Sequence, residues 1–242
     1  MLDVFRNMVQ SKRPQVNKKL VVYYAIRELS GIIVMGAALF WSAGTIGWWS
    51  AWAALGVMLG WMIAMAILTI MIHPEMLLKR LGPQRGTKQW DISLLSLISI
   101  VQLVKYIVAG LDHRNHWTNN SAISAQLFAL VLCILGYSLF VWAASSNRAF
   151  SQIVHIDSTG RQEVACKGPY KYLRHPGYLG AIAYEIAVPV LLSSLFALLI
   201  GIVTVSLFVV RTATEDSSLR KELEGYKEYS RQVQYRIIPK IW

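Results

Sequence analysis

Charged residues are scarce in this chain of 242 residues. They make up 15% of the sequence, whereas a soluble domain usually carries about a quarter. Hydrophobic residues account for 55% of the chain, and the mean hydropathy is positive. This composition excludes an ordinary soluble domain and predicts an integral membrane protein. The length suits one domain that crosses the membrane several times.

Cysteine is also rare. Cys133 lies within an apolar block, and Cys166 lies in the polar segment that follows it. Two cysteines placed in this way form neither a disulfide framework nor a zinc-type spacing, so we expect no metal site. A Gly-x-Gly-x-x-Gly motif after a strand pattern is missing, which argues against a Rossmann dinucleotide site. The N-terminal segment lacks a convincing signal-peptide cleavage site.

Acidic residues are few relative to basic ones: the sequence has 13 Asp and Glu against 24 Lys and Arg, a net charge of +11. In a soluble protein this balance would suggest a nucleic-acid partner. Beside membrane spans, basic residues are better explained by orientation and by anionic lipid headgroups. Nine tryptophans, several of them at the ends of apolar blocks, are typical of the aromatic belt at a bilayer interface. We therefore expect membrane lipids as partners, and no nucleic acid.

Six apolar blocks follow one another along the chain. The first four approach or exceed the roughly 20 residues that a helix needs to cross a bilayer. The last two are only about 15 residues long, below the usual minimum for a span, and predict a tight, short helical hairpin. The blocks cover residues 20–43, 47–72, 92–111, 122–144, 178–192 and 195–210. We expect an all-α membrane protein of about six transmembrane helices, followed by an amphipathic, charged tail over 211–242.

The lysines and arginines predict an orientation. If both termini are cytoplasmic, the cytoplasmic segments hold 21 of the 24 basic residues. This asymmetry is what the positive-inside rule predicts. The segments 145–177 and 211–242 then lie on the same side of the membrane, where they can meet.

The stretch 168–180 combines tyrosine, lysine, arginine and histidine with glycine and proline, between two apolar blocks. Glycine and proline favour turns, and the polar side chains would be costly in hydrocarbon. The stretch therefore predicts a segment at the membrane surface that re-enters the bilayer at Tyr178. It is either part of a functional site or an interfacial loop anchored by Tyr and Lys.

Three acidic or basic positions in the C-terminal spans are candidates for function. Arg211 and Glu215, four residues apart, share one face of a helix, which also fits an ordinary ion pair at the end of a span. Glu185 lies within the fifth span, where an acid is costly and often functional. Its alternative role is structural, in a pair with Arg27, Lys105 or a tyrosine.

Three motifs occur in a fixed order: Gly168-Pro169-Tyr170, then Arg174-His175-Pro176-Gly177-Tyr178, then Arg211 with Glu215-Asp216, Leu219, Gly225-Tyr226 and Tyr229. In this order they resemble the isoprenylcysteine carboxyl methyltransferase family. The similarity is greatest to its bacterial membrane methyltransferases and weaker to the phospholipid methyltransferases. It covers residues 147–242 well and residues 73–120 loosely.

The resemblance implies S-adenosylmethionine as the cofactor, bound without a Rossmann domain. It assigns a catalytic role to Glu215 and to Arg211, which corresponds to the arginine that faces the substrate carboxylate. Two departures matter: the second acid of the family's glutamate pair is Asp216 here, and His155 aligns only by its spacing from Tyr170. The implied cofactor contacts are His155, Gln162, Glu163, Val164, Ala165, Tyr170, His175, Pro176, Gly177, Tyr178 and Glu215.

The chemistry of these residues is compatible with that role. A carboxylate such as Glu215 can pair with a cationic part of the cofactor, and tyrosines can stack on adenine or lie near a sulfonium. A carboxylate acceptor is ionised at neutral pH and needs no general base, while Arg211 can orient it through a planar bidentate contact. For His175, which precedes a proline, we favour a positional role.

We therefore expect one membrane domain over 1–242, with four N-terminal spans in 1–144 and a cofactor-binding methyltransferase core in 145–242. The expected reaction is carboxyl O-methylation of a prenylcysteine-like or other lipophilic substrate. The alternatives are a phospholipid headgroup N-methyltransferase, an NADPH-dependent membrane reductase and a non-enzymatic lipid-binding protein. The resemblance suggests a bacterial inner membrane, and the oligomeric state is left open.

Overall fold

The computed structural model describes residues 18–74, 76–81, 87–118, 121–151, 153–154 and 162–242. Within these ranges every assigned element is a helix and none is a strand, which confirms the all-α fold class. The six long helices are α2 (Lys18–Ala43), α3 (Trp49–Ile67), α5 (Gln89–Asn115), α6 (Ile123–Ser145), α7 (Pro176–Leu191) and α8 (Leu195–Glu222). The shorter ones are the π-helix η1 (Leu68–Ile72), α4 (Met76–Arg80), the 3-10 helix η2 (Gly168–Lys171) and α9 (Tyr226–Gln232).

Five of the described helices are long and apolar enough to cross a membrane, and α7 is a shorter apolar helix of 16 residues. Large apolar side chains such as Ile33, Phe128 and Ile202 point outward on this bundle. In water that surface would be unfavourable, whereas in a bilayer it faces lipid. The protein is therefore an integral membrane protein.

The helix ends follow local signals in the sequence. Pro176 occupies the first turn of α7, where its missing N–H costs nothing. Ser194 caps α8, because its hydroxyl accepts a hydrogen bond from the Ala197 amide at 3.1 Å. After η1, His73-Pro74 ends the second apolar block, as a proline prevents the helix from continuing.

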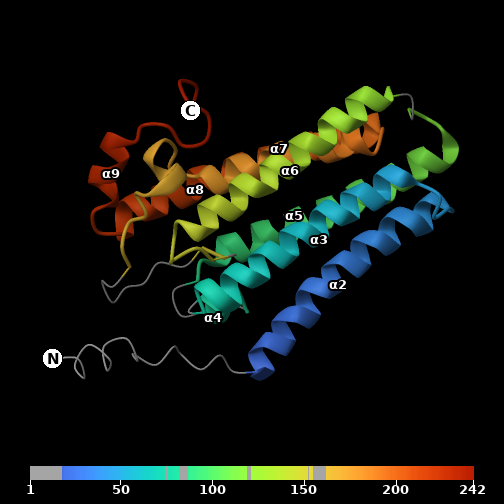
Figure 1. Cartoon of the computed structure of the whole chain (residues 1–242). Coiled ribbons are helices and arrows are strands. Elements are labelled where there is room, and N and C mark those ends of the chain that lie inside the picture. Colours follow the sequence, from blue (N-terminus) through green and yellow to red (C-terminus); the bar gives the residue numbers. More distant parts are fainter. Residues whose placement is uncertain (1–17, 75, 82–86, 119–120, 152, 155–161) are drawn as a thin grey trace.

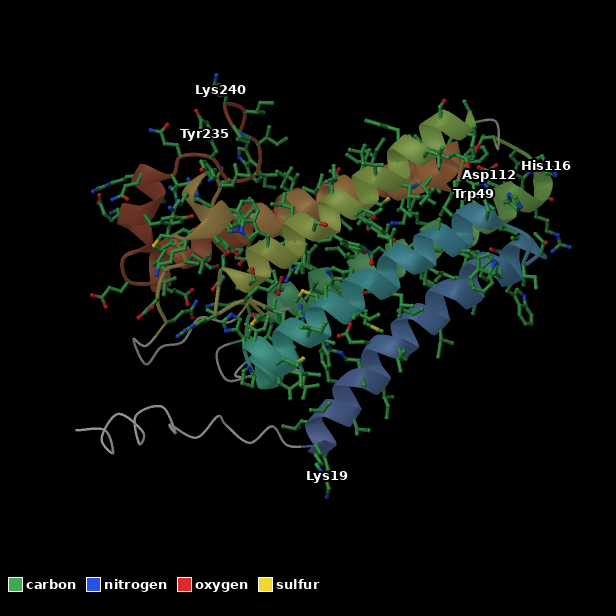
Figure 2. All side chains as sticks on the ribbon, in the orientation of Figure 1. Lys19, Trp49, Asp112, His116, Tyr235 and Lys240 are labelled. Atoms are coloured by element: carbon green, nitrogen blue, oxygen red, sulfur yellow. The ribbon has the colours of Figure 1, made fainter. Side chains whose placement is uncertain are left out.

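Successive long helices run up and down the bundle (Figure 1). The start of α2, the short helices α4 and α9, and the C-terminus lie at one end, which we call the tail end. Figure 2 shows Tyr235 and Lys240 at the tail end and Asp112 and His116 at the opposite end. The segments before α7 and after α8 therefore meet on one side of the bundle.

Glycine allows two pairs of these helices to touch through their backbones. A Cβ atom added at Gly180 of α7 would lie 2.3 Å from the carbonyl oxygen of Gly136 in α6. A Cβ atom at Gly201 of α8 would lie 2.7 Å from the carbonyl oxygen of Glu185 in α7. Such small residues are what close helix packing in membranes requires. The C-terminal helices α6, α7 and α8 consequently form a tightly packed unit, against which α5 packs through α8.

One part of the expected hairpin differs from the sequence-based prediction. We expected two short helices and a charged tail from residue 211. Instead, α8 is 28 residues long and continues past residue 211 to Glu222. The charged residues after Val210 do not end the helix, because several of them have partners inside the bundle. The segment after α8 therefore begins only at Leu223.

Candidate functional site

A cavity of about 550 Å³ lies among α3, α5, α6, α7, α8 and α9. We call its part at the tail end the tail chamber. This part is polar and aromatic, and its lining residues include Gln162, Tyr170, His175 and Tyr226. Its part along the middle of the bundle, the inner chamber, is lined by residues of the spans: Met58, Trp61, Leu95, Ile98, Ser99, Gln102, Tyr106, Tyr137, Phe140, Tyr184 and Glu185. A cavity of this size suits a small-molecule ligand.

Tyr178, Arg211 and Glu215 meet where the two chambers join, and we call this position the neck. The Tyr178 hydroxyl donates a hydrogen bond of 2.5 Å to Glu215 Oε2. The Arg211 guanidinium carbon lies 5.3 Å from the centroid of the Tyr178 ring, within the range of a cation–π contact. All three side chains line the cavity. Residues 37 positions apart in the chain, one at the start of α7 and one in α8, are thus brought into direct contact.

Arg211 does not pair with Glu215 as an i, i+4 ion pair, because its partner is Asp91 at the start of α5. Arg211 Nε donates to Asp91 Oδ1 at 2.6 Å and Nη2 donates to Oδ2 at 3.0 Å. Asp91 also accepts from the Val154 amide at 2.7 Å and is completely buried. A guanidinium carries five N–H donors, of which the bidentate contact uses two. The guanidinium plane of Arg211 is therefore held in a fixed orientation beside the cavity.

Asp216, next to Glu215, points away from the neck and binds several basic side chains. It accepts from Arg174 Nε at 2.8 Å and from Arg236 Nε at 3.0 Å, and the Tyr226 hydroxyl donates to it at 2.9 Å. His175 Nε2 lies 3.4 Å from the same carboxylate. This second acid, shorter than the glutamate of the family pattern, holds the segment before α7 to the segment after α8.

The C-terminal segment forms one wall of the tail chamber. The backbone amides of Arg174 and His175 donate to the carbonyl oxygens of Tyr235 and Arg236 at 3.0 and 2.9 Å. The hydroxyl of Tyr229 donates to the carbonyl oxygen of Tyr170 at 2.8 Å. Burial raises the pKa of this hydroxyl above its usual value, so it stays protonated as a donor. The last residues therefore support the site rather than only anchoring the chain at an interface.

The predicted site residues can now be placed. Arg211 and Glu215 line the cavity, and so do the following predicted cofactor contacts: Gln162, Glu163, Val164, Ala165, Tyr170, His175, Gly177 and Tyr178. Pro176 is buried at the start of α7 and is not among the lining residues. His155 lies outside the residues that the structure describes. Their contacts with a bound molecule stay predictions.

Sequence reasoning missed Asp91 and underestimated Asp216. Asp91 precedes the third apolar block and looks like an acid that favours a helix N-terminus. Its pairing with Arg211 joins residues 120 positions apart, which no local pattern reveals. For Asp216 a signal existed, namely its place beside Glu215 in the family pattern.

Glu185 has the lysine partner that was one of the sequence-based alternatives. Lys105 Nζ lies 2.6 Å from Glu185 Oε2, and both side chains are almost completely buried. The amide of Gln102 donates to the other carboxylate oxygen at 2.9 Å. Arg27, the other basic candidate, pairs instead with its neighbour Glu28. The Lys105–Glu185 pair joins α5 to α7 beside the inner chamber.

A second cavity, of about 670 Å³, lies between α3 and α6 and is lined by Gly56 and Gly60 among others. A Cβ added at either glycine would meet no atom of another described helix within 4 Å, so among the described residues neither glycine packs against a neighbouring helix. Trp61 and Tyr137 line both cavities, and their rings are stacked with centroids 5.1 Å apart. This aromatic pair thus lies between the inner chamber and the second cavity, which we call the groove.

Fold and site together define an all-helical integral membrane protein with a cavity that is polar and aromatic at the tail end and has both apolar and polar lining residues between the spans. Residues 128–221 match the sequence model of the isoprenylcysteine carboxyl methyltransferase family. This segment, which spans most of α6, all of α7 and most of α8, is similar to that family.

The chain is also similar to individual proteins. The chain is 26% identical over 144 residues to protein-S-isoprenylcysteine O-methyltransferase B of Arabidopsis thaliana, covering 58% of this chain and 70% of the relative. It is 31% identical over 130 residues to the Delta(14)-sterol reductase TM7SF2 of Mus musculus, covering 47% of this chain but only 31% of that protein.

A solved structure of a eukaryotic intramembrane Ras methyltransferase, ICMT, has the same fold. It superposes with a TM-score of 0.54 at 17% sequence identity, over 99% of this chain and 91% of the other. At this identity the similarity concerns the fold. It extends the likeness beyond the C-terminal segment to the N-terminal helices.

Proposed function

We propose that this protein transfers a methyl group from S-adenosylmethionine to the carboxylate of a lipophilic acid, of which a prenylated cysteine is the nearest model. The observation that carries the proposal is the neck. There, Glu215, Tyr178 and Arg211 lie between the polar tail chamber and the inner chamber among the membrane spans, so that a water-soluble donor and a lipid-like acceptor can meet.

The tail chamber fits the chemistry of the cofactor. Glu215 and Glu163 supply two carboxylates for a ligand with a sulfonium and an ammonium group, and Tyr170 and Tyr226 supply aromatic surface for an adenine. When bound, S-adenosylmethionine supplies an electrophilic methyl group. Tyr178 contributes by fixing the position of the Glu215 carboxylate through its 2.5 Å hydrogen bond.

The acceptor needs orientation more than activation. A carboxylate is already ionised at neutral pH, so no residue has to remove a proton. Arg211, held by Asp91 and itself buried, is placed to orient that carboxylate. His175 contacts Asp216 and Tyr226, which supports a positional role.

We further propose how the protein sits in the cell. The acceptor reaches the inner chamber sideways from the bilayer, through the groove between α3 and α6 and past Trp61 and Tyr137. The distribution of basic residues supports cytoplasmic termini, with the tail chamber open to the cytoplasm, and the resemblance supports a bacterial inner membrane. The chain acts as one domain, because α5 from the N-terminal part supplies Asp91 to the neck.

The test uses the purified protein in lipid nanodiscs. Calorimetric titration with S-adenosylhomocysteine and with NADPH separates a methyltransferase from a reductase, and we expect binding of the former alone. Label from methyl-labelled S-adenosylmethionine is then followed into N-acetyl-S-farnesylcysteine and into phosphatidylethanolamine. A base-labile product on the first is expected. A base-stable product on the second, or binding of NADPH alone, would overturn the proposal.

A further inference from the structure

The inner chamber contains more polar groups than a chamber for a plain hydrocarbon chain requires. Gln102, Tyr106, Tyr184 and Glu185 all line it, and they come from the middle of α5 and α7. Burying an alkyl chain against such groups leaves their remaining donors and acceptors without water, which costs free energy. Leucine or valine at these positions would bind an alkyl chain better.

Together with Lys105, whose Nζ lies 4.8 Å from the centroid of the Tyr106 ring, these groups form a cluster that we call the inner polar cluster: Gln102, Lys105, Tyr106, Tyr184 and Glu185. Glu185 accepts from Lys105 at 2.6 Å and from Gln102 at 2.9 Å. The hydroxyls of Tyr106 and Tyr184 lie 3.5 Å apart. Since Lys105 already neutralises Glu185, the structural need for a charge partner is met without Gln102 or the tyrosine hydroxyls.

Trp61 of α3 provides an independent observation. Its indole Nε1–H is buried and has no hydrogen-bond partner among the described residues, although Trp61 lines the same cavity. An indole N–H is a donor only, and a buried donor without an acceptor costs about 1–3 kcal/mol. An oxygen atom on a bound molecule would satisfy it.

The distance from the neck places this polar region well along the acceptor. Glu185 lies seven residues beyond Tyr178 on α7, which corresponds to roughly 10 Å of helix. An acceptor whose carboxylate lies beside Arg211 would therefore reach the cluster with the middle of its hydrophobic part. A single polar headgroup could not occupy both the position beside Arg211 and the inner polar cluster.

We propose that the natural acceptor is an oxygenated lipophilic acid, with a hydroxyl or carbonyl oxygen within its hydrophobic part that hydrogen-bonds to the inner polar cluster and Trp61. This inference rests on the proposed carboxyl methylation and names the class of acceptor. Gln102 is then a residue that determines specificity. It makes no contact with the reacting atoms.

The experiment compares hexadecanoic acid with a positional series of its hydroxylated isomers, using the whole protein in nanodiscs with S-adenosylhomocysteine or labelled S-adenosylmethionine. Two readouts are taken for every acid: thermal stabilisation, which reports binding, and base-labile label, which reports transfer. The variants are Gln102→Leu and Tyr106→Phe. Gln126→Leu is the matched control, since Gln126 lies on α6 outside the cavity lining and bonds to the Ser121 carbonyl.

We expect at least one mid-chain isomer to bind about tenfold more tightly than hexadecanoic acid, a preference that one or two buried hydrogen bonds can supply. Gln102→Leu should remove most of this preference, while Gln126→Leu retains it. Equal or tighter binding of the unsubstituted acid overturns the inference, as does a preference that Gln102→Leu and Tyr106→Phe leave intact. Because binding is measured separately, a hydroxyl preference without label refutes carboxyl methylation alone, and label without preference refutes this inference alone.

Discussion

At the scale of single residues, the neck is held by two acids that differ in their partners. Glu215 faces the cavity and accepts from Tyr178, whereas Asp216, the next residue, faces Arg174 and Arg236. Neighbouring residues on a helix point about 100° apart, so one turn of α8 serves two purposes. One acid is available to a ligand, and the other holds the protein around it.

Substitution of Arg211 separates its two roles. Arg211→Lys keeps the charge beside Asp91 but loses the bidentate geometry, so we expect S-adenosylhomocysteine affinity to be nearly unchanged and turnover to fall about a hundredfold. Arg211→Ala leaves the buried Asp91 without its cationic partner and should lower stability by about 3–5 kcal/mol. Calorimetry, steady-state kinetics and thermal unfolding measure these effects. Equal losses of affinity and turnover in the lysine variant would contradict the assigned role.

Asp216→Asn tests the acid that holds the tail. The change leaves the buried Arg174 guanidinium without its anionic partner, and we expect a loss of about 3–5 kcal/mol in the free energy of unfolding. Glu222→Gln is the control, because the Lys88–Glu222 pair is partly exposed and surface pairs contribute less than about 1 kcal/mol. Thermal unfolding in detergent compares the two. Similar melting temperatures for both variants would rule out a special role for Asp216.

At the scale of helices, the contact between α6 and α7 determines where the neck residues of α7 lie. Gly180 lies two residues beyond Tyr178, and its approach to the Gly136 backbone fixes the separation of the two helices. Any shift of α7 would move Tyr178 relative to Glu215 on α8. The packing of small residues is therefore connected to the geometry of the site.

Gly180→Ala should force these helices apart, because the new Cβ would lie 2.3 Å from the Gly136 carbonyl oxygen. We expect a loss of about 1–3 kcal/mol in stability, together with weaker S-adenosylhomocysteine binding. Gly56→Ala is the matched control: its Cβ meets no described atom within 4 Å, and the gain in helix propensity should stabilise α3 by about 0.5–1 kcal/mol. Thermal unfolding measures the stability of both variants, and a Gly180→Ala protein as stable as the unsubstituted protein would refute the packing argument.

Apolar block lengths predicted the long helices, since hydrophobic runs bounded by proline, serine and glycine are local signals. The motif order likewise predicted that Tyr178 and Glu215 belong together. The end of α8 was wrong, because partners from α5, α7 and the tail, invisible in a local pattern, keep residues 211–222 helical. Asp91 was missed for the same reason: its partner Arg211 is distant in the chain and near only after folding.

At the scale of the whole molecule, α9, which contributes lining residues to the tail chamber, lies at the end of the bundle where the C-terminus lies (Figure 1). The positive-inside distribution supports our proposal that this end faces the cytoplasm. The two cysteines provide a direct probe of that orientation, since Cys166 is exposed and Cys133 is buried.

A membrane-impermeant maleimide should label Cys166 in inverted membrane vesicles and not in right-side-out vesicles. Cys166→Ser should abolish the label, because the remaining Cys133 is buried within α6. Mass spectrometry or gel shift measures the modification. Labelling only from the outside would reverse the proposed orientation of the protein.

The buried Lys105–Glu185 pair also has a consequence for biogenesis. The two residues are 80 positions apart, so at about 5–20 residues per second a ribosome needs roughly 4–16 s to deliver the glutamate after the lysine. During that interval a half-synthesised chain must shelter an uncompensated ammonium group, whether inside the translocon or near the headgroups. A nascent protein stalled before α7 would therefore be a natural substrate for membrane quality control.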